Sequence, residues 1–151
     1  MTSCLHPIIA KWLVLMPESN RMFWVYNRPA FFWALLILIL CGIPGDKIPE
    51  LTFLEWLRPD KIVHVILFAV LSYLLLKGFG RQNQFQFLHI HAGKIAIIFS
   101  ITYGCILEIL QEYIFIHRSG DIRDAAANAV GAFIGLWIYR KYFHKNTVAG
   151  R

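Results

Sequence analysis

The sequence predicts an all-α protein: a membrane-embedded bundle of four short transmembrane helices, preceded by an N-terminal interfacial segment. Of its 151 residues, 58% are hydrophobic and 16% are charged, whereas soluble domains carry about 25% charged residues. Four runs contain no Asp, Glu, Lys or Arg, at residues 30–43, 62–76, 95–107 and 125–139. Helices that are apolar on every face are typical of membrane spans and rare in so small a soluble domain.

The first 29 residues are predicted to form a cytoplasmic or interfacial arm. Their apolar part, residues 5–16, is interrupted by His6, Pro7 and Lys11, and it lacks the basic start and small-residue cleavage site of a signal peptide. The sequence therefore divides into this arm (1–29), a four-helix transmembrane domain (30–143) and a basic cytoplasmic tail (144–151).

The four apolar runs are 13 to 15 residues long, but a helix needs about 20 residues to cross a hydrocarbon core of about 30 Å. The helices are therefore expected to extend into their polar flanks, the second from near Asp60 and the third through Glu108 and Gln111. Ionisable groups carried into a span face the bundle interior or a hydrated cavity. The alternative is a soluble protein with apolar core helices.

The distribution of Lys and Arg predicts the orientation. Ten of the fifteen lie before the first run, between the second and third runs, or after the fourth. The positive-inside rule therefore places both termini of a multi-pass protein in the cytoplasm. The net charge of +6 is therefore expected to hold the protein against anionic lipid headgroups. No nucleic-acid-binding motif accompanies the basic residues.

Polar residues gather where three helix ends should meet on the extracytoplasmic side. Within each helix a spacing of three or four residues places them on one face, which implies one pocket. The residues expected there are Asp60, Lys61, His64, Glu108, Gln111, Arg118, Asp121, Arg123, Asp124 and Asn128. On the fourth helix this face continues as Ala127, Gly131 and Gly135, which allow close approach of a neighbouring backbone.

These residues also have structural interpretations. Asp121 or Asp124 is a candidate N-cap of the fourth helix, and a salt-bridge network closing the outer end of the bundle is a further alternative. Glu108 is harder to assign to structure alone, because a carboxylate that follows thirteen uncharged residues must be paired, protonated or hydrated. His89 and His91 form only a weak metal pattern, and the sequence assigns no metal site and no cofactor.

At these residues the sequence resembles the VanZ-like family of bacterial membrane proteins. The matching elements are Asp60-Lys61-Ile62-Val63-His64, Glu108-Ile109-Leu110-Gln111, and Arg118 through Asp121, Asp124 and Asn128 to Gly131 and Gly135. The resemblance implies a cell-envelope function in the bacterial inner membrane. The family is named for a member linked to resistance to the glycopeptide teicoplanin. The resemblance therefore links this protein to resistance only through the name of the family.

The leading hypothesis is a site that binds or modifies an envelope lipid or a lipid-linked saccharide. Lys61, Arg118 and Arg123 would hold phosphate or carboxylate groups, with Asp60, Gln111 and Asn128 as further substrate-binding candidates. The candidate catalytic residues are Glu108 as general acid or base, His64 as a second proton carrier, and Asp121 and Asp124, which would orient the arginines or hold a divalent ion. A small transporter or flippase and a non-enzymatic envelope assembly factor are the alternatives. Whether a reaction is catalysed stays open, and a homo-oligomer is compatible with each interpretation.

Overall fold

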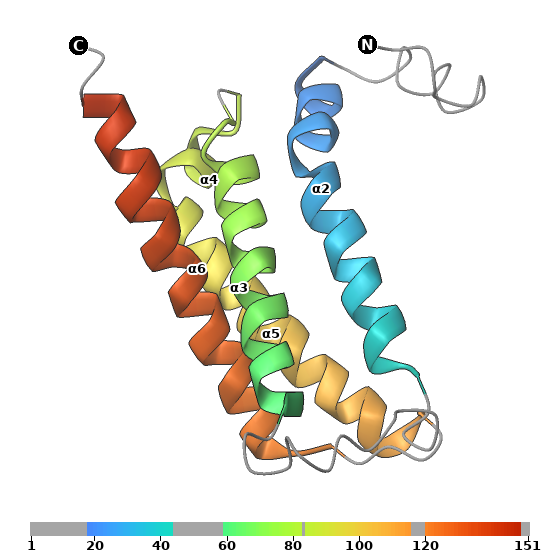
Figure 1. Cartoon of the computed structure of the whole chain (residues 1–151). Helices are drawn as coiled ribbons and strands as arrows, with labels where there is room; N and C mark the ends of the chain where they lie inside the picture. Colours follow the sequence, from blue (N-terminus) through green and yellow to red (C-terminus); the bar gives the residue numbers. More distant parts are fainter. Residues whose placement is uncertain (1–17, 44–58, 83, 116–119, 149–151) are drawn as a thin grey trace.

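The computed structural model describes residues 18–43, 59–82, 84–115 and 120–148, and these residues form helices and short connections, with no strand among them (Figure 1). The all-α prediction is therefore confirmed. The four predicted apolar runs fall on the four long helices. The helices are α2 (Glu18–Cys41), α3 (Pro59–Phe79), the short α4 (Gln86–Ile90), α5 (Ala92–Tyr113) and α6 (Ile122–Val148).

Successive long helices run in opposite directions. In Figure 1, α2 and α5 run toward one end of the bundle, and α3 and α6 run toward the other. Consequently α3 and α6 begin, and α2 and α5 end, at the same end, which we call the site end. The start of α2 and the last turns of α6 lie at the opposite end. The ends of the second, third and fourth long helices that carry the polar residues therefore meet at one depth, as the sequence predicts.

Local sequence features set the helix boundaries at the site end. Pro59 is the first residue of α3, where its fixed φ suits a helix and its missing N–H is not needed. At the end of α5, the backbone N–H groups of Ile114 and Phe115 both donate to the carbonyl of Leu110 over 2.9 Å. The chain then enters α6 directly after Asp121.

The central helix is α3, which packs against α2, α5 and most extensively against α6. Its side chains Phe68, Leu71 and Leu76 are almost fully buried, together with Ile37 of α2 and Leu107 of α5. The core is thus built around one helix, and the polar residues of α3 are held by the same packing.

Two glycines bring α6 into backbone contact with α3. A Cβ atom added at Gly131 would lie 2.3 Å from the carbonyl oxygen of Val65, and one at Gly135 would lie 2.3 Å from that of Ala69. Any larger residue would push the helices apart. The predicted close approach along this face is confirmed, and it fixes the height of the first turns of α6 against those of α3.

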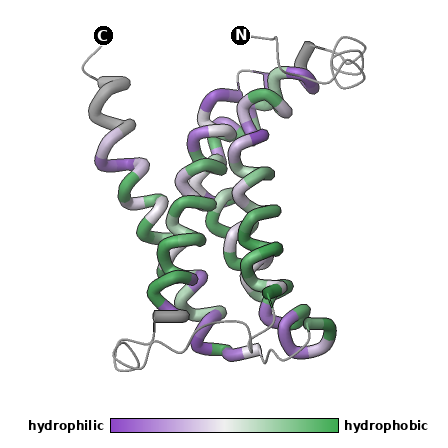
Figure 2. The backbone as a smooth tube through the Cα atoms, turned by 45° about the vertical axis from the view of Figure 1, so that its right-hand side comes forward, coloured by the Kyte–Doolittle hydropathy of each residue, from purple (hydrophilic) through white to green (hydrophobic). Residues whose placement is uncertain are grey.

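The prediction of four transmembrane helices is corrected to three in the described part of the chain. The helical segments Asn20–Cys41, Lys61–Phe79 and Ala92–Tyr113 are long and apolar enough to cross a membrane. Helix α6 is long enough, but it is less hydrophobic than these three and is not among the candidate spans. The physical reason is that α6 uses alanine and glycine for close packing where the other helices use leucine and isoleucine. Figure 2 shows hydrophobic residues along the middle of the helices and hydrophilic residues toward their ends.

Candidate functional site

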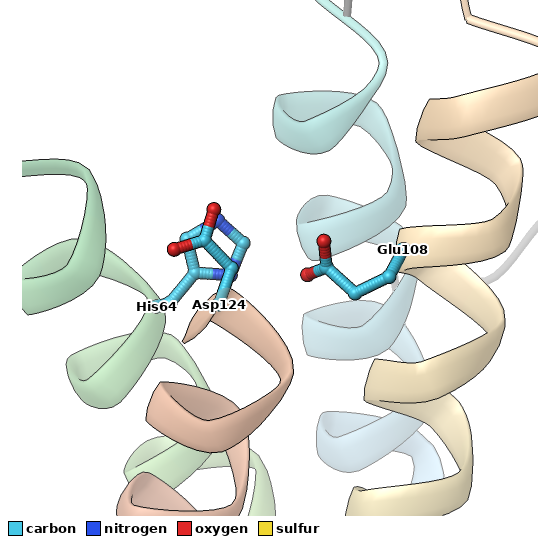
Figure 3. Close-up of side chains that lie close together, drawn as sticks. All are labelled: His64, Glu108 and Asp124. Atoms are coloured by element: carbon cyan, nitrogen blue, oxygen red, sulfur yellow. The ribbon is translucent and has the colours of Figure 1, made fainter. Parts of the chain in front are cut away.

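Three helices contribute polar side chains to the site end. We call this group the polar cluster: Lys61, His64, Glu108, Asp121, Asp124 and Asn128. The start of α3 supplies the first two, α5 supplies Glu108, and the start of α6 with the residue before it supplies the other three. Figure 3 shows His64, Glu108 and Asp124 directed toward a common space. The fold therefore brings together most of the side chains that the sequence places in one pocket.

Lys61 joins α3 to α6 through two ion pairs. Its Nζ atom lies 3.1 Å from Oδ2 of Asp121 and 2.5 Å from Oδ1 of Asp124. The pair with Asp124 is partly desolvated, because the side chains of Lys61 and Asp124 are only 21% and 14% exposed, and partial burial strengthens the attraction. The charge of Lys61 is thus compensated by two carboxylates of the protein itself.

A buried chain of hydrogen bonds connects α3, α6 and α5. Nδ1 of His64 lies 2.9 Å from Oδ1 of Asn128, and Nδ2 of Asn128 donates to Oε1 of Glu108 over 3.4 Å. Because an amide oxygen only accepts hydrogen bonds, His64 carries a proton on Nδ1. In the neutral ring, Nε2 then keeps its lone pair. Asn128 therefore fixes the tautomer of His64.

Glu108 also binds the segment that leads into α6. The residue is 8% exposed, and its Oε2 atom accepts the backbone N–H of Asp121 over 3.1 Å. One turn further along α5, Oε2 of Glu112 accepts the backbone N–H of Gly120 over 2.9 Å. Hydrogen bonds of this kind stabilise a carboxylate that has lost most of its water. Both acids of α5 therefore position the start of α6.

Asp121 is the N-cap of α6. Its Oδ1 atom accepts the backbone N–H of Arg123 over 2.8 Å, and its carbonyl accepts that of Asp124, also over 2.8 Å. The hydrogen bond from the backbone of Arg123, followed by the nearby ammonium of Lys61, lowers the pKa of Asp121 below its usual value. The capping interpretation is therefore confirmed for Asp121.

One residue expected in the pocket lies elsewhere. Gln111 is buried, and its Nε2 donates to the backbone carbonyl of Cys41 over 3.3 Å, so it ties α5 to the end of α2. The side chain of Arg123 is exposed, and its charge acts on Asp121 at the edge of the polar cluster. Arg118 and the side chain of Asp60 lie outside the described residues. His89 is an exposed residue of α4, and His91, which directly follows α4, is half-buried; both lie at the opposite end of the bundle.

Two glycines that the sequence analysis missed make room for the polar cluster. A Cβ atom at Gly104 would lie 3.0 Å from Cβ and from Nδ2 of Asn128, and one at Gly120 would lie 2.6 Å from the carbonyl oxygen of Glu108. Gly104 precedes Glu108 by four residues and so lies on the same face of α5. That spacing was a usable sign of a close neighbour, whereas Gly120 resembled an ordinary loop glycine.

The balance of charge in the polar cluster is negative. Its members include three carboxylates, those of Glu108, Asp121 and Asp124, against one ammonium, that of Lys61. One potential ligand atom from each of His64, Glu108 and Asp124 lies within 4.8 Å of the others. These residue types and this spacing allow a metal ion to be held, although the sequence assigned none.

Comparisons with known proteins identify the family and no individual relative. No curated protein and no solved structure matches the chain. A model of the VanZ/LLP1 family matches residues 5–144, nearly the whole chain, and this range includes every residue of the polar cluster. The chain therefore belongs to the VanZ/LLP1 family.

Proposed function

We propose that this protein is embedded in the bacterial cytoplasmic membrane and that its polar cluster binds and modifies the headgroup of an envelope lipid or lipid-linked saccharide. The observation that carries the proposal is the buried hydrogen-bonded chain of His64, Asn128 and Glu108. It lies at the end of a bundle whose outer surface is largely apolar. Ionisable and amide groups in such a position are costly to bury and usually functional in membrane proteins.

The proposed membrane position follows from three apolar helices and from the charge distribution. α2, α3 and α5 have the length and composition of membrane spans, and α6 accompanies α3 because their backbones are in contact. The excess of Lys and Arg in the flanks that lead to the other end assigns that end to the cytoplasm. The polar cluster then lies at the depth of the outer-leaflet headgroups.

Exposed apolar side chains adjoin the polar cluster, as a lipid substrate requires. Ile62 and Ile66 of α3 are 43% and 55% exposed, and Ile109, which follows Glu108, is 57% exposed. Acyl or polyprenyl chains can lie against these residues while the headgroup reaches the polar side chains. A soluble substrate would not need this arrangement.

Two residues are the candidate proton carriers for the modification. Glu108 is a buried carboxylate, and His64 presents the lone pair of Nε2 because Nδ1 is bonded to Asn128. Either group can take a proton from a hydroxyl or a water molecule whose oxygen attacks a phosphate ester of the headgroup. The bond to the leaving oxygen breaks, and that oxygen then receives the proton. The reaction class would be transfer or hydrolysis.

The test compares two acids that lie one turn apart on α5. The full-length protein is reconstituted in nanodiscs with a bacterial lipid extract, and lipids are compared before and after incubation by mass spectrometry. We expect the wild type to enrich or convert one headgroup class. Glu108→Gln should lose this effect, whereas Glu112→Gln should retain it, because Glu112 is exposed and lies outside the polar cluster.

Two outcomes would contradict the proposal. One is a wild-type protein that neither enriches nor converts any lipid relative to empty nanodiscs. The other is full activity in Glu108→Gln. Equal yields and equal helical circular dichroism of the two variants establish that both are folded, so a loss in one variant alone is assigned to the site.

One observation favours a second candidate, an envelope assembly factor whose polar cluster is structural. Lys61 is engaged by Asp121 and Asp124 across the α3 and α6 interface, which is what a network that closes the bundle requires. Under this candidate, exchanging the charges of Lys61 and Asp124 should preserve function. A headgroup site would not tolerate the exchange, so the double variant distinguishes the two.

Resistance to teicoplanin is a separate part of the proposal and rests on the family alone. It is tested by measuring the teicoplanin susceptibility of a bacterium that expresses the wild type or Glu108→Gln at equal levels. A difference between the two strains supports a role in resistance, and equal susceptibility removes it without affecting the lipid proposal.

A further inference from the structure

We infer that His64, Glu108 and Asp124 bind a divalent cation of the zinc or manganese class. The inference goes beyond the proposed function, which needs no metal ion. Only the suggestion that the cation contacts the lipid headgroup rests on that function. The three residues come from α3, α5 and α6 and point toward one another (Figure 3).

The geometry suits a small cation. The ligand atoms of the three residues lie within 4.8 Å of one another. Bonds of about 2.0–2.2 Å to nitrogen and oxygen place neighbouring ligands about 3–4 Å apart. Small side-chain rotations would therefore close the site around the ion, with no change in the helices.

The ligand types narrow the choice of metal. One imidazole and two carboxylates are typical of zinc, manganese or iron sites, whereas calcium and magnesium prefer oxygen ligands alone. The lone pair of His64 that remains for a metal is on Nε2, because Nδ1 donates to Asn128. Three protein ligands leave further coordination positions for water or for a ligand oxygen.

The partners behind these ligands are those that metal sites use. A metal-binding histidine commonly donates its second N–H to an oxygen of the protein, which fixes the orientation of the ring. Asn128 does this for His64, and it also donates to Glu108. Glu108 accepts a second bond from the backbone of Asp121. Two of the three ligands, His64 and Glu108, are thus oriented by hydrogen bonds before the ion arrives, and only small rotations remain.

Electrostatics supports a cation more than an anion. The polar cluster sets three carboxylates against the ammonium of Lys61, and the exposed Arg123 acts on Asp121 at the edge of the cluster. The space between the three ligand atoms therefore attracts a cation, whereas a phosphate would bind at the edge, near the basic side chains. A bound divalent ion cancels this excess of negative charge. With the ion present, the cluster can accept a phosphate oxygen of the headgroup as a further ligand. His64 then acts as a ligand, and the proton-carrying role remains with Glu108.

Lys61 is the competitor of the ion. Its ammonium forms an ion pair with Oδ1 of Asp124, so its positive charge repels a cation bound by the same carboxylate. Removing it should therefore strengthen metal binding, even though the same change removes two ion pairs of the fold. A purely structural cluster gives no reason for such a gain.

The test measures metal binding by the purified full-length protein in detergent after treatment with EDTA. Mn²⁺ is titrated and followed by electron paramagnetic resonance, and Zn²⁺ is followed by elemental analysis after desalting. We expect one saturable equivalent in the wild type and none in His64→Gln or Asp124→Asn. Lys61→Met should bind Mn²⁺ about tenfold more tightly.

A matched control separates this site from the other histidines. The double variant His89→Ala and His91→Ala removes an exposed and a half-buried imidazole outside the polar cluster and should keep the full equivalent. The inference is overturned if the wild type shows no saturable equivalent, if His64→Gln retains it, or if the double variant loses it. Weaker binding in Lys61→Met would also contradict it.

Lipid analysis of the same samples separates the two proposals. Lipid enrichment that EDTA leaves unchanged, in a protein without a bound metal, refutes the cation and leaves the lipid function standing. A saturable metal equivalent without any lipid enrichment or conversion supports the cation and refutes the lipid function. Loss of both the metal and the lipid effect in EDTA, with recovery on adding Mn²⁺ or Zn²⁺, supports a cation in contact with the headgroup.

Discussion

Nδ1 of His64 lies 2.9 Å from the amide oxygen of Asn128, so a hydrogen bond between buried side chains ties α3 to α6 at the site end. The same amide donates to Glu108 of α5. Because both contacts use one side chain, the orientation of Asn128 determines at once which nitrogen of His64 carries a proton and where one oxygen of Glu108 lies.

Replacing Asn128 by alanine should destabilise the bundle as well as the site. The change leaves Nδ1 of His64 and Oε1 of Glu108 without their hydrogen bonds to Asn128, while Oε2 of Glu108 keeps the backbone N–H of Asp121. Loss of these buried partners costs about 1–3 kcal/mol of unfolding free energy. The measurement is denaturant unfolding in detergent followed by tryptophan fluorescence. Val130→Ala is the control, because Val130 is exposed on the same helix and should change stability little. Equal stability of the two variants would show that the hydrogen-bonded chain contributes nothing.

Adding one methyl group at Gly131 should separate α6 from α3. The new Cβ would lie 2.3 Å from the backbone oxygen of Val65, and a backbone atom cannot rotate away as a side chain can. We expect Gly131→Ala to lower the unfolding free energy by about 1–3 kcal/mol. At Gly93 the added atom meets only side-chain atoms, at 3.6 and 3.9 Å. Gly93→Ala should therefore be neutral, and a Gly131→Ala protein as stable as that control would disprove the close contact.

The same backbone contact explains how much of the site the sequence could predict. Helix ranges and the gathering of polar ends follow from the apolar runs and from alternating helix directions, and both are visible in the sequence. The partners of each side chain depend on how each helix is rotated about its own axis. For α6 the spacing of Gly131 and Gly135 predicts which face packs closely, but it does not say which backbone atoms of α3 the glycines contact.

Gln111 illustrates the limit of reasoning from spacing. Three residues along a helix correspond to a rotation of about 300°, so Gln111 is displaced by about 60° from Glu108. That displacement is enough to direct Gln111 to the backbone of Cys41 in α2. For α6, the counting of apolar residues overestimated its hydropathy, because many of them are alanines that serve close packing.

Lowering the pH should remove the contribution of the Asp121 charge to stability. The folded-state pKa of Asp121 is lowered, first by the hydrogen bond from the backbone of Arg123 and then by Lys61. A carboxyl group whose pKa is lowered by folding stabilises the fold at pH values above its unfolded-state pKa of 3.8. This contribution is lost as the pH falls through the lower pKa of the folded state. Asp121→Asn keeps a capping side chain but lacks the charge.

The melting temperatures of the wild type and Asp121→Asn in detergent measure this contribution. The wild type should be the more stable protein at pH values well above 3.8, the unfolded pKa of Asp121. The difference between them should shrink below pH 3.8, where Asp121 becomes protonated and the two side chains are both neutral. A difference that stays constant over this range would show that the charge of Asp121 has no part in the stability of the fold.

Labelling of single cysteines should place the two ends of the bundle on opposite sides of the membrane. Glu112→Cys marks the site end, and Gln84→Cys marks the other end; both positions are exposed. In a background without Cys4, Cys41 and Cys105, a membrane-impermeant maleimide applied to intact cells or spheroplasts should label position 112. Position 84 should react only after permeabilisation. The positive-inside rule requires this result, because most basic residues flank the end that contains position 84. Labelling of both positions from one side would refute the spanning arrangement. Labelling of position 84 but not of position 112 in intact cells would place the polar cluster on the cytoplasmic side, where outer-leaflet lipids could not reach it.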